Sequence, residues 1–431
     1  MFEALLNAFR APDLRRRILY VAGILMVFRL LAHVPVPGVD SEQLKTFLQT
    51  NQIFGLLDLF SGGGLTNFSV VALGVNPYIN ASIIMQLMTG VVPSLQALQR
   101  EGEYGRQKIN QYTRYLTVPL ALLQAYGYLA ILASQGIVDD FDILSLATIS
   151  QMITLAAGTV LAMWIGELIT ERGIGNGISF IIFAGIVARV PQGVATYMSN
   201  PDIAGGVAFI ILAIVVVAAI VFIQEGQRRI PIQYASRVRG RRMYQGAQTF
   251  LPLRVNQAGV IPIIFAVSIL LFPSQIASYF ATPAGAEASS IVNQVADFIV
   301  AFLQPNGLPY MIGYFLLTVG FTYFYTAFTF KPDETADQLR KNGGFIPGIR
   351  PGAPTRDYLQ KVVFRLSLAG ALFLGVIAVS PIALSAIFPT GVVGSFALGG
   401  TALLIVVSVV VETMKQIEAQ LMMRNYEGFI R

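Results

Sequence analysis

The chain of 431 residues contains no cysteine and only one histidine, His33. Without cysteine it can form neither a disulfide framework nor a thiolate metal site, and a lone imidazole excludes sites that need two histidines. The pair Gly-Lys does not occur, so the nucleotide-binding loop that contains this pair is also excluded. We therefore expect a protein that is not an enzyme and that has no metal site and no cofactor.

Charged residues are also scarce. They make up 12% of the chain, against about 25% in soluble domains, while 55% of the residues are hydrophobic and the mean hydropathy is +0.65. A membrane-spanning helix needs about 20 apolar residues, and the alternating pattern of a β-barrel is missing. We therefore predict ten helical spans, at 18–34, 75–92, 113–134, 150–168, 178–197, 203–223, 256–273, 308–329, 366–388 and 394–411.

The positions of the basic residues predict the orientation of these spans. If the N-terminus lies in the cytosol, 26 of the 29 Lys and Arg residues fall in cytosolic segments. Only Lys45 and Arg189 fall outside, and Arg29 lies in the first span, near enough to its outer end to reach the interface. Because Lys and Arg accumulate in cytosolic connections, both termini are expected to be cytosolic.

Two cytosolic connections, 224–255 and 330–365, each carry seven Lys or Arg residues. Such loops can anchor the chain and attract anionic lipids, which is the simpler interpretation. We favour a docking surface for an acidic protein or for the phosphate backbone of RNA. The Gly-Ile-Arg-Pro-Gly turn at 348–352 would present one arginine at a defined place.

The second and seventh spans share an unusual feature, because each contains a glycine and a proline near its start. These residues are Gly74 and Pro77 in the second span and Gly259 and Pro262 in the seventh. If the ten spans form two halves of five, both interruptions occupy the second span of a half. Paired interruptions of this kind indicate the functional site between inverted repeats, although prolines are also common in membrane helices generally.

The segment 59–88 is apolar but carries glycine breaks and polar side chains at bilayer depth. Such a segment is tolerated only where it faces protein or a water-filled cavity, so we predict that it lines and partly closes a pore. Ion- and proton-coupled transporters usually place Asp, Glu or His near mid-membrane. The centres of the predicted spans have none, which disfavours the alternative function, a secondary transporter of a small solute.

Several long segments resemble one known family, the SecY subunits of bacterial Sec protein translocases. They include FRLLAHVPVPGVD (28–40), EGEYGRQKINQYTRY (101–115), GELITERGIGNGISFIIFAGIV (166–187) and FKPDETADQLRKNGGFIPGIRPG (330–352). The resemblance implies an all-α polytopic membrane protein. Its ten transmembrane helices would form two inverted five-helix halves, 1–200 and 201–431, around a central hourglass pore.

The resemblance also implies the function and the partners. The chain would be a channel in the bacterial cytoplasmic membrane that translocates unfolded secretory polypeptides and releases membrane helices laterally. A SecA motor ATPase or a translating ribosome would drive the movement, since the channel has no catalytic site of its own. Further partners would be the SecE and SecG membrane subunits, signal sequences, the unfolded polypeptide substrates and membrane lipids.

Four sets of site residues follow from the resemblance. The plug, a short half-helix at about 60–73 that blocks the resting pore, includes Phe60, Ser61, Gly62, Gly63, Gly64, Leu65, Phe68 and Leu73. The hydrophobic pore ring consists of Val75, Ile79, Ile182, Ile264 and Ile405. The lateral gate, between the second and seventh spans, includes Gln86 and Asn256. The surface that docks the motor or the ribosome includes Arg228, Arg229, Arg237, Arg239, Arg241, Arg242 and Arg350.

Overall fold

The computed structural model of the chain describes most of its residues. The described ranges are 9–39, 41–50, 58, 61–138, 142, 145–199, 203–234, 237–239, 242–244, 248–281, 291–304, 307–387 and 399–427. Two residues of the predicted sites, Phe60 and Arg241, lie outside these ranges.

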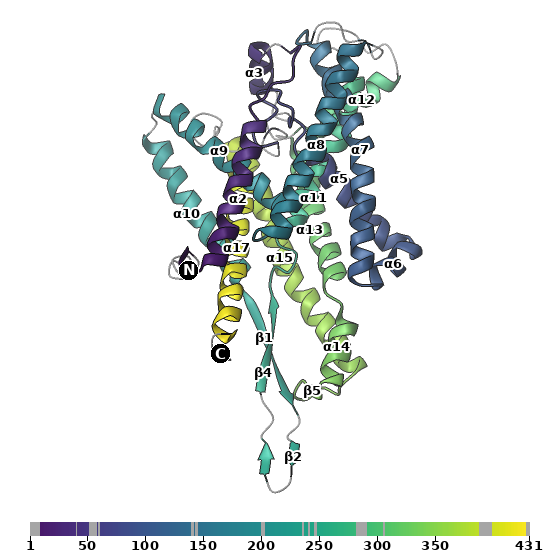
Figure 1. Cartoon of the computed structure of the whole chain (residues 1–431), viewed down its shortest axis with the longest axis vertical. Helices are drawn as coiled ribbons and strands as arrows, with labels where there is room; N and C mark the ends of the chain where they lie inside the picture. Colours follow the sequence, from purple (N-terminus) through teal and green to yellow (C-terminus); the bar gives the residue numbers. More distant parts are fainter. Residues whose placement is uncertain are drawn as a thin grey trace.

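Helices dominate the structure (Figure 1). Those up to residue 225 are α2 (Pro12–Leu31), α3 (Ser41–Thr50), α5 (Asn76–Val91), α6 (Pro93–Arg100), α7 (Glu103–Ser134), α8 (Leu146–Arg172), α9 (Gly177–Ser199) and α10 (Ile203–Glu225). Those from residue 261 onward are α11 (Ile261–Phe280), α12 (Ile291–Phe302), α13 (Leu308–Thr329), α14 (Pro332–Lys341), α15 (Ala353–Ile387) and α17 (Gly399–Glu427). The strands are β1 (Gln227–Tyr234), β2 (Arg237–Arg239), β3 (Arg242–Tyr244), β4 (Gln248–Arg254) and β5 (Gly344–Phe345).

Each of the ten predicted spans falls largely within a helix. Within the described ranges, α7, α8, α11, α13 and α15 are long and apolar enough to cross a membrane. Helices α5 and α6 form a sixth candidate, which is bent by 98° at Val92. The other predicted spans correspond to α2, α9, α10 and α17, each of at least 20 residues, or about 30 Å of helix. The prediction of a polytopic helical membrane protein is confirmed.

Helices α5 and α11 begin in the same way. A glycine with positive φ, Gly74 (56°) or Gly259 (65°), comes two residues before each helix. A proline then occupies the first turn of the helix, where its missing N–H costs nothing because that donor has no partner within the helix. The two prolines therefore start helices rather than interrupt them. Helix α11 begins at Ile261, five residues later than the predicted span.

Strands occur in the two basic connections, a feature that the sequence analysis did not predict. Strand β1 pairs antiparallel with β4 from Gln227↔Arg254 to Gln233↔Gln248, and β2 pairs with β3. The burial of β1 alternates, with Ile230 and Ile232 inside, as expected for a strand with one covered face. The resulting hairpin projects beyond the helices, and both marked chain ends lie towards the same side of the molecule (Figure 1).

The two basic connections pack together at the base of this hairpin. Strands β1 to β5 and the turn 346–352 are called the hairpin body below. Strand β5 of the second connection pairs with the end of β1, at Gln233↔Phe345 and Tyr234↔Gly344. A separate apolar core joins the hairpin to α15, and it consists of Ile230, Leu253, Ile346, Leu359, Val362 and Val363. Loops that are about a hundred residues apart in sequence thus present a single surface.

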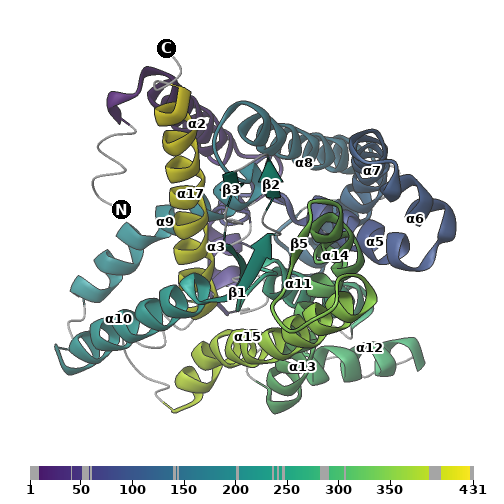
Figure 2. The same cartoon turned by 90° about the horizontal axis from the view of Figure 1, so that it is seen from below.

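The helices surround a large central core. Neighbouring pairs pack in sequence order, including α7 with α8, α8 with α9, and α13 with α15. Contacts between the segments 1–200 and 201–431 include α5 with α11, α7 with α11, and α9 with α17. Figure 2, seen from below, shows α2 and α8 along one edge and α13 and α15 along the opposite edge. The five residues of the predicted ring, together with Leu65, Phe68 and Leu73 of the predicted plug, lie in the core that these helices share.

Candidate functional site

The described part of the plug, residues 61–73, is a series of turns. Gly62 (φ 71°) and Gly63 (φ 84°) adopt left-handed backbone conformations, which suit glycine and break a right-handed helix. The half-helix expected from the family resemblance is therefore absent from residues 61–73. Phe68 also has a positive φ of 40°, which is uncommon for a bulky residue and places its side chain in the core.

The second half of the plug pairs with the segment that follows α2. The backbone N–H of Val70 donates to the carbonyl of Val34 at 3.0 Å, and that of Val36 donates to the carbonyl of Phe68 at 2.9 Å. These bonds satisfy main-chain groups that would otherwise be costly inside a membrane protein. The plug therefore lies beside the end of α2, and the isolated antiparallel bridge Pro35↔Ser69 joins it to the segment that follows this helix.

Close contacts with three helices also fix the plug. A side chain at Gly62 would lie 3.2 Å from the ring of Phe28 (α2) and 3.3 Å from Cα of Gly185 (α9). On α8, a Cβ atom at Gly158 would lie only 1.8 Å from the carbonyl oxygen of Val70. The absence of side chains at these glycines allows the plug backbone to lie directly against the helices.

The five residues of the predicted pore ring are all buried. Their exposed fractions range from 0% for Val75 to 7% for Ile264. They come from the start of α5, from α9, α11 and α17, yet they belong to one apolar cluster that also contains the plug residues Leu65, Phe68 and Leu73. Residues separated by up to 330 positions thus contribute to the same large core, which runs from Val21 to Val409.

The predicted gate residues lie on or beside the packed helices α5 and α11. Gln86 is on α5, whereas Asn256 precedes α11 and donates from its Nδ2 to the carbonyl of Gly259 at 3.0 Å. The Gln86 Oε1 and Asn256 Oδ1 atoms are buried, and neither accepts a hydrogen bond from the described residues. Buried acceptors without partners reduce the stability of the packing around them.

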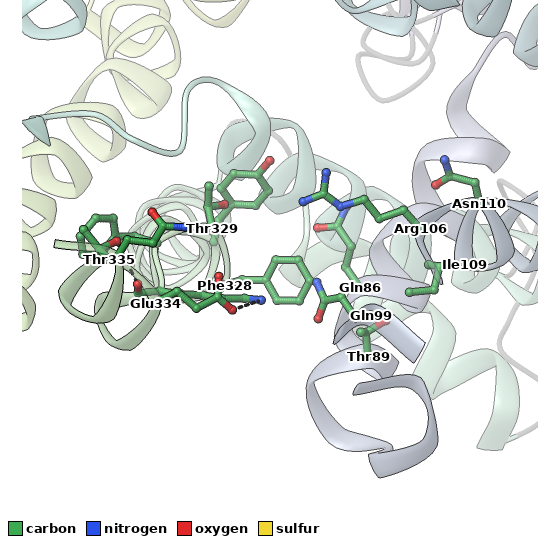
Figure 3. Close-up of a pocket in the computed structure, with 14 residues that line it drawn as sticks. Gln86, Thr89, Gln99, Arg106, Ile109, Asn110, Phe328, Thr329, Glu334 and Thr335 are labelled. Carbon is green, nitrogen blue, oxygen red and sulfur yellow. Dashed lines mark hydrogen bonds and ion pairs between the residues drawn. The ribbon is translucent and has the colours of Figure 1, made fainter. Parts of the chain in front are cut away.

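A pocket of about 510 Å³ lies beside Gln86. Figure 3 shows residues of α5, α6 and α7 on one side and residues of α13 and α14 on the other. Its lining is mainly polar and includes Gln86, Gln99, Arg106, Asn110 and Gln338. Asn256 is not among the lining residues, so the two predicted gate residues do not share this pocket.

The described arginines of the predicted docking surface lie on the hairpin body. Arg228 and Arg229 are exposed on β1, and Arg237, Arg239 and Arg242 belong to β2 and β3.

Arg350 is exposed in a turn whose flanking glycines, Gly348 (φ 81°) and Gly352 (φ 104°), both have positive φ. Its carbonyl accepts a hydrogen bond from the Thr355 hydroxyl at 2.8 Å. The turn is therefore a defined structure that presents a single arginine.

A group of charged side chains beside the plug was not expected from the sequence, and of these Asp58 is buried whereas Arg29 and Arg189 are partly exposed. Asp58 forms an ion pair with Arg189 of α9, and Arg29 of α2 donates to the carbonyl of Gly62. Arg29 was expected to reach the membrane interface, but its guanidinium instead turns inward to the plug. Asp58 and Arg189 are 131 positions apart, so no local pattern could have revealed their pairing.

Comparisons with known proteins agree with this geometry. The sequence profile of the SecY family matches residues 69–414. The chain is 46% identical to the protein translocase subunit SecY of Mycobacterium tuberculosis and 44% identical to that of Streptomyces scabiei, with complete coverage of both sequences in each case.

Solved structures show the same fold. A protein-conducting channel matches with a TM-score of 0.62 at 17% identity, covering 93% of this chain and 91% of that one. A SecY structure matches with a TM-score of 0.61, 17% identity and the same coverages, and its plug domain is described as stabilising the closed state and maintaining a membrane seal. Sec61 from a canine ribosome–channel complex matches with a TM-score of 0.59 at 16% identity, covering 93% and 91%.

These findings do not support a secondary transporter. The profile match, the full-length relatives and the shared fold all point to one kind of molecule, a multi-pass membrane protein that conducts polypeptides. The chain belongs to the SecY family of protein translocase subunits.

Proposed function

We propose that unfolded secretory polypeptides cross this channel through the ring of Val75, Ile79, Ile182, Ile264 and Ile405, and that the plug closes the ring at rest. The observation that carries the proposal is the single buried cluster to which the ring residues and the apolar plug residues Leu65, Phe68 and Leu73 belong, although they come from distant segments. The plug described in the related SecY structure has the corresponding sealing role in that protein.

The side chains of the ring suit a seal around a moving chain. Dispersion contacts are individually weak and non-directional, so branched aliphatic groups can surround many sequences without binding any of them tightly. When the polypeptide leaves, the same groups close on one another, and an apolar constriction excludes water and ions. A polar ring would lose this property, because it would stay hydrated.

Membrane helices would leave sideways between α5 and α11, with Gln86 and Asn256 at the gate. The two helices begin alike and belong to the proposed halves 1–200 and 201–431, which would be related as inverted repeats. Leu, Ile, Phe and Val each favour the membrane by about 0.3–0.6 kcal/mol. A signal sequence with several such residues would therefore bias a gate whose closed state contains unsatisfied acceptors.

The hairpin body would face the cytosol and dock the driving partner. It carries most of the arginines of the two basic connections, and the positive-inside rule then places both termini in the cytosol of a bacterium, with the channel in its cytoplasmic membrane. The partner would be a SecA motor or a ribosome, as with the canine relative in its ribosome–channel complex. SecE and SecG would complete the membrane assembly.

Deletion of residues 62–70 tests whether the plug seals the resting channel. The shortened channel, reconstituted in planar bilayers, should pass ions at rest because the apolar mass beside the ring is removed. An unchanged resting conductance would refute the sealing role of the plug.

Arg350→Glu tests the docking surface. The substitution should stop SecA-driven translocation into vesicles while the channel still inserts and assembles. Lys341→Glu, an equal charge change at an exposed position of the same connection, is the matched control. Equal loss in both variants would show that total charge matters rather than the defined turn, and translocation at the normal rate by Arg350→Glu would exclude the assignment.

A further inference from the structure

We propose that Asp58, Arg189 and Arg29 form an electrostatic latch that holds the plug in the closed position. The inference rests on the stopper role proposed above and adds the groups that keep the stopper in place. All three are positioning residues, since the translocating chain passes the ring and they act through the plug. The contacts come from two helices, α2 and α9, on which the plug rests.

Asp58 accepts hydrogen bonds from several residues of the first half of the plug. Its Oδ1 accepts from the backbone N–H of Thr66 at 2.9 Å, and its Oδ2 accepts from the Thr66 hydroxyl at 2.6 Å. Its carbonyl accepts from the backbone N–H of Gly63 at 2.9 Å and from the Ser61 hydroxyl at 3.1 Å. One residue therefore binds Ser61, Gly63 and Thr66, so displacement of this part of the plug must break these bonds or carry Asp58 with it.

Arg189 connects this unit to α9. The Asp58 side chain is only 2% exposed and that of Arg189 is 29% exposed, so water screens the pair much less than it screens a surface ion pair. Carboxylate–guanidinium hydrogen bonds are also about twice as strong as neutral ones. The plug cannot leave α9 without breaking this pair.

Arg29 holds the same loop from a second helix. Its Nη1 donates to the Gly62 carbonyl, and Gly62 is wedged between Phe28 of α2 and Gly185 of α9. Both arginines therefore act on the same short loop, one on its carboxylate and one on its backbone.

The latch is reversible because its parts are charged. When the plug moves out, water molecules replace the contacts between Asp58 and the two arginines. Hydration of the separated charges recovers much of the lost interaction energy. An apolar contact of the same area would instead expose hydrocarbon on opening. The arrangement thus gives a closed state that is specific in geometry yet can open when a signal sequence separates α5 from α11.

The test compares resting ion leak in reconstituted vesicles for Asp58→Asn, Arg189→Gln and Arg189→Lys. Asn is nearly isosteric with Asp, so the fold is preserved while the charge is lost. We expect the first two variants to raise the leak by at least about tenfold, which corresponds to about 1.4 kcal/mol, and Arg189→Lys to stay close to the original. A seal that is kept in Arg189→Lys but lost in Arg189→Gln is a result that a purely structural role would not predict.

The matched control is Lys415→Gln, which breaks another interhelical ion pair, with Glu225 at 2.9 Å, between α17 and α10. It should not change the leak. An increase equal to that of Asp58→Asn would show that lost ion pairs loosen the bundle in general, and it would overturn the latch.

A second readout follows the plug itself. Because the chain has no cysteine, a Leu65→Cys substitution introduces a single thiol, at a plug position that is 2% exposed. Asp58→Asn should increase the reaction rate of this thiol with a membrane-impermeant maleimide by about tenfold. If deletion of 62–70 leaks but Asp58→Asn neither leaks nor exposes the introduced thiol, the latch is wrong and the stopper stands. If the deletion does not leak either, the stopper itself is wrong.

Discussion

The contact between Gly158 of α8 and the plug leads to a quantitative prediction. A Cβ atom at position 158 would lie 1.8 Å from the carbonyl oxygen of Val70. Backbone cannot rotate away as a side chain can, so the plug must move by about 1.2 Å to restore a tolerable separation of 3.0 Å. We therefore expect Gly158→Ala to displace the plug from its closed position with the addition of a single methyl group.

The magnitude follows from overpacking energies. Extra methyl groups in a packed core cost about 1–3 kcal/mol. If the open state relieves most of this strain, the ratio of open to closed channels should rise by about 5- to 150-fold, since 1.4 kcal/mol is a factor of ten. The effect on global stability should be smaller than the effect on gating, because the plug can move while the helices stay packed.

The assay is resting conductance of the reconstituted channel in planar bilayers. Gly320→Ala on α13 is the matched control, because a Cβ atom there would meet nothing within 4 Å. Gly158→Ala should leak and Gly320→Ala should not. Equal and low conductance in both variants would refute the conclusion that the plug rests against α8.

Two further predictions concern the gate and the hairpin body. A cysteine at Gln86 should crosslink to a bound signal sequence, whereas one at Val376, which is 60% exposed on α15, should contact lipid. Similar crosslinking at both positions would count against the gate. Leu253→Asp should destabilise the hairpin base and increase its proteolysis, because an unpaired buried carboxylate costs several kcal/mol. Phe250→Asp on the same strand, where the side chain is 59% exposed, should leave proteolysis unchanged.

The helical part of the fold could be predicted from composition and hydropathy. Apolar runs of about 20 residues are sufficient signals because a membrane admits few alternatives to the helix. The exact helix starts were harder, since Pro262 looked like an interruption and proves to lie in the first turn of α11. A proline after a positive-φ glycine is a start signal, and it could have corrected the boundary.

The hairpin was overlooked because its charge dominated the interpretation of the loop. Alternation is present in the strand, since Arg229 and Pro231 are exposed on either side of the buried Ile230. That period of two indicates a strand even in a basic segment. The junction of the hairpin with α15 had no such local signal, because it depends on residues more than a hundred positions apart.

The plug and the charges around it mark the limit of sequence reasoning. Its glycines were recognised as breaks in an apolar segment, but which helix each one meets depends on the tertiary fold. The partnership of Asp58 with Arg189 is likewise a tertiary contact. Arg29 was misjudged because a side chain near a helix end can reach either the interface or the protein interior, and hydropathy does not distinguish the two.

The central claim is that polypeptides pass through the apolar ring, and crosslinking from the ring tests it most directly. A secretory chain arrested in mid-translocation would be probed with single cysteines at Ile182 and Ile405, in a protein that has no other thiol. A cysteine at Phe222, which is 77% exposed on α10, serves as the control. The account predicts crosslinks from both ring positions and none from position 222. Crosslinks from position 222 alone would contradict it.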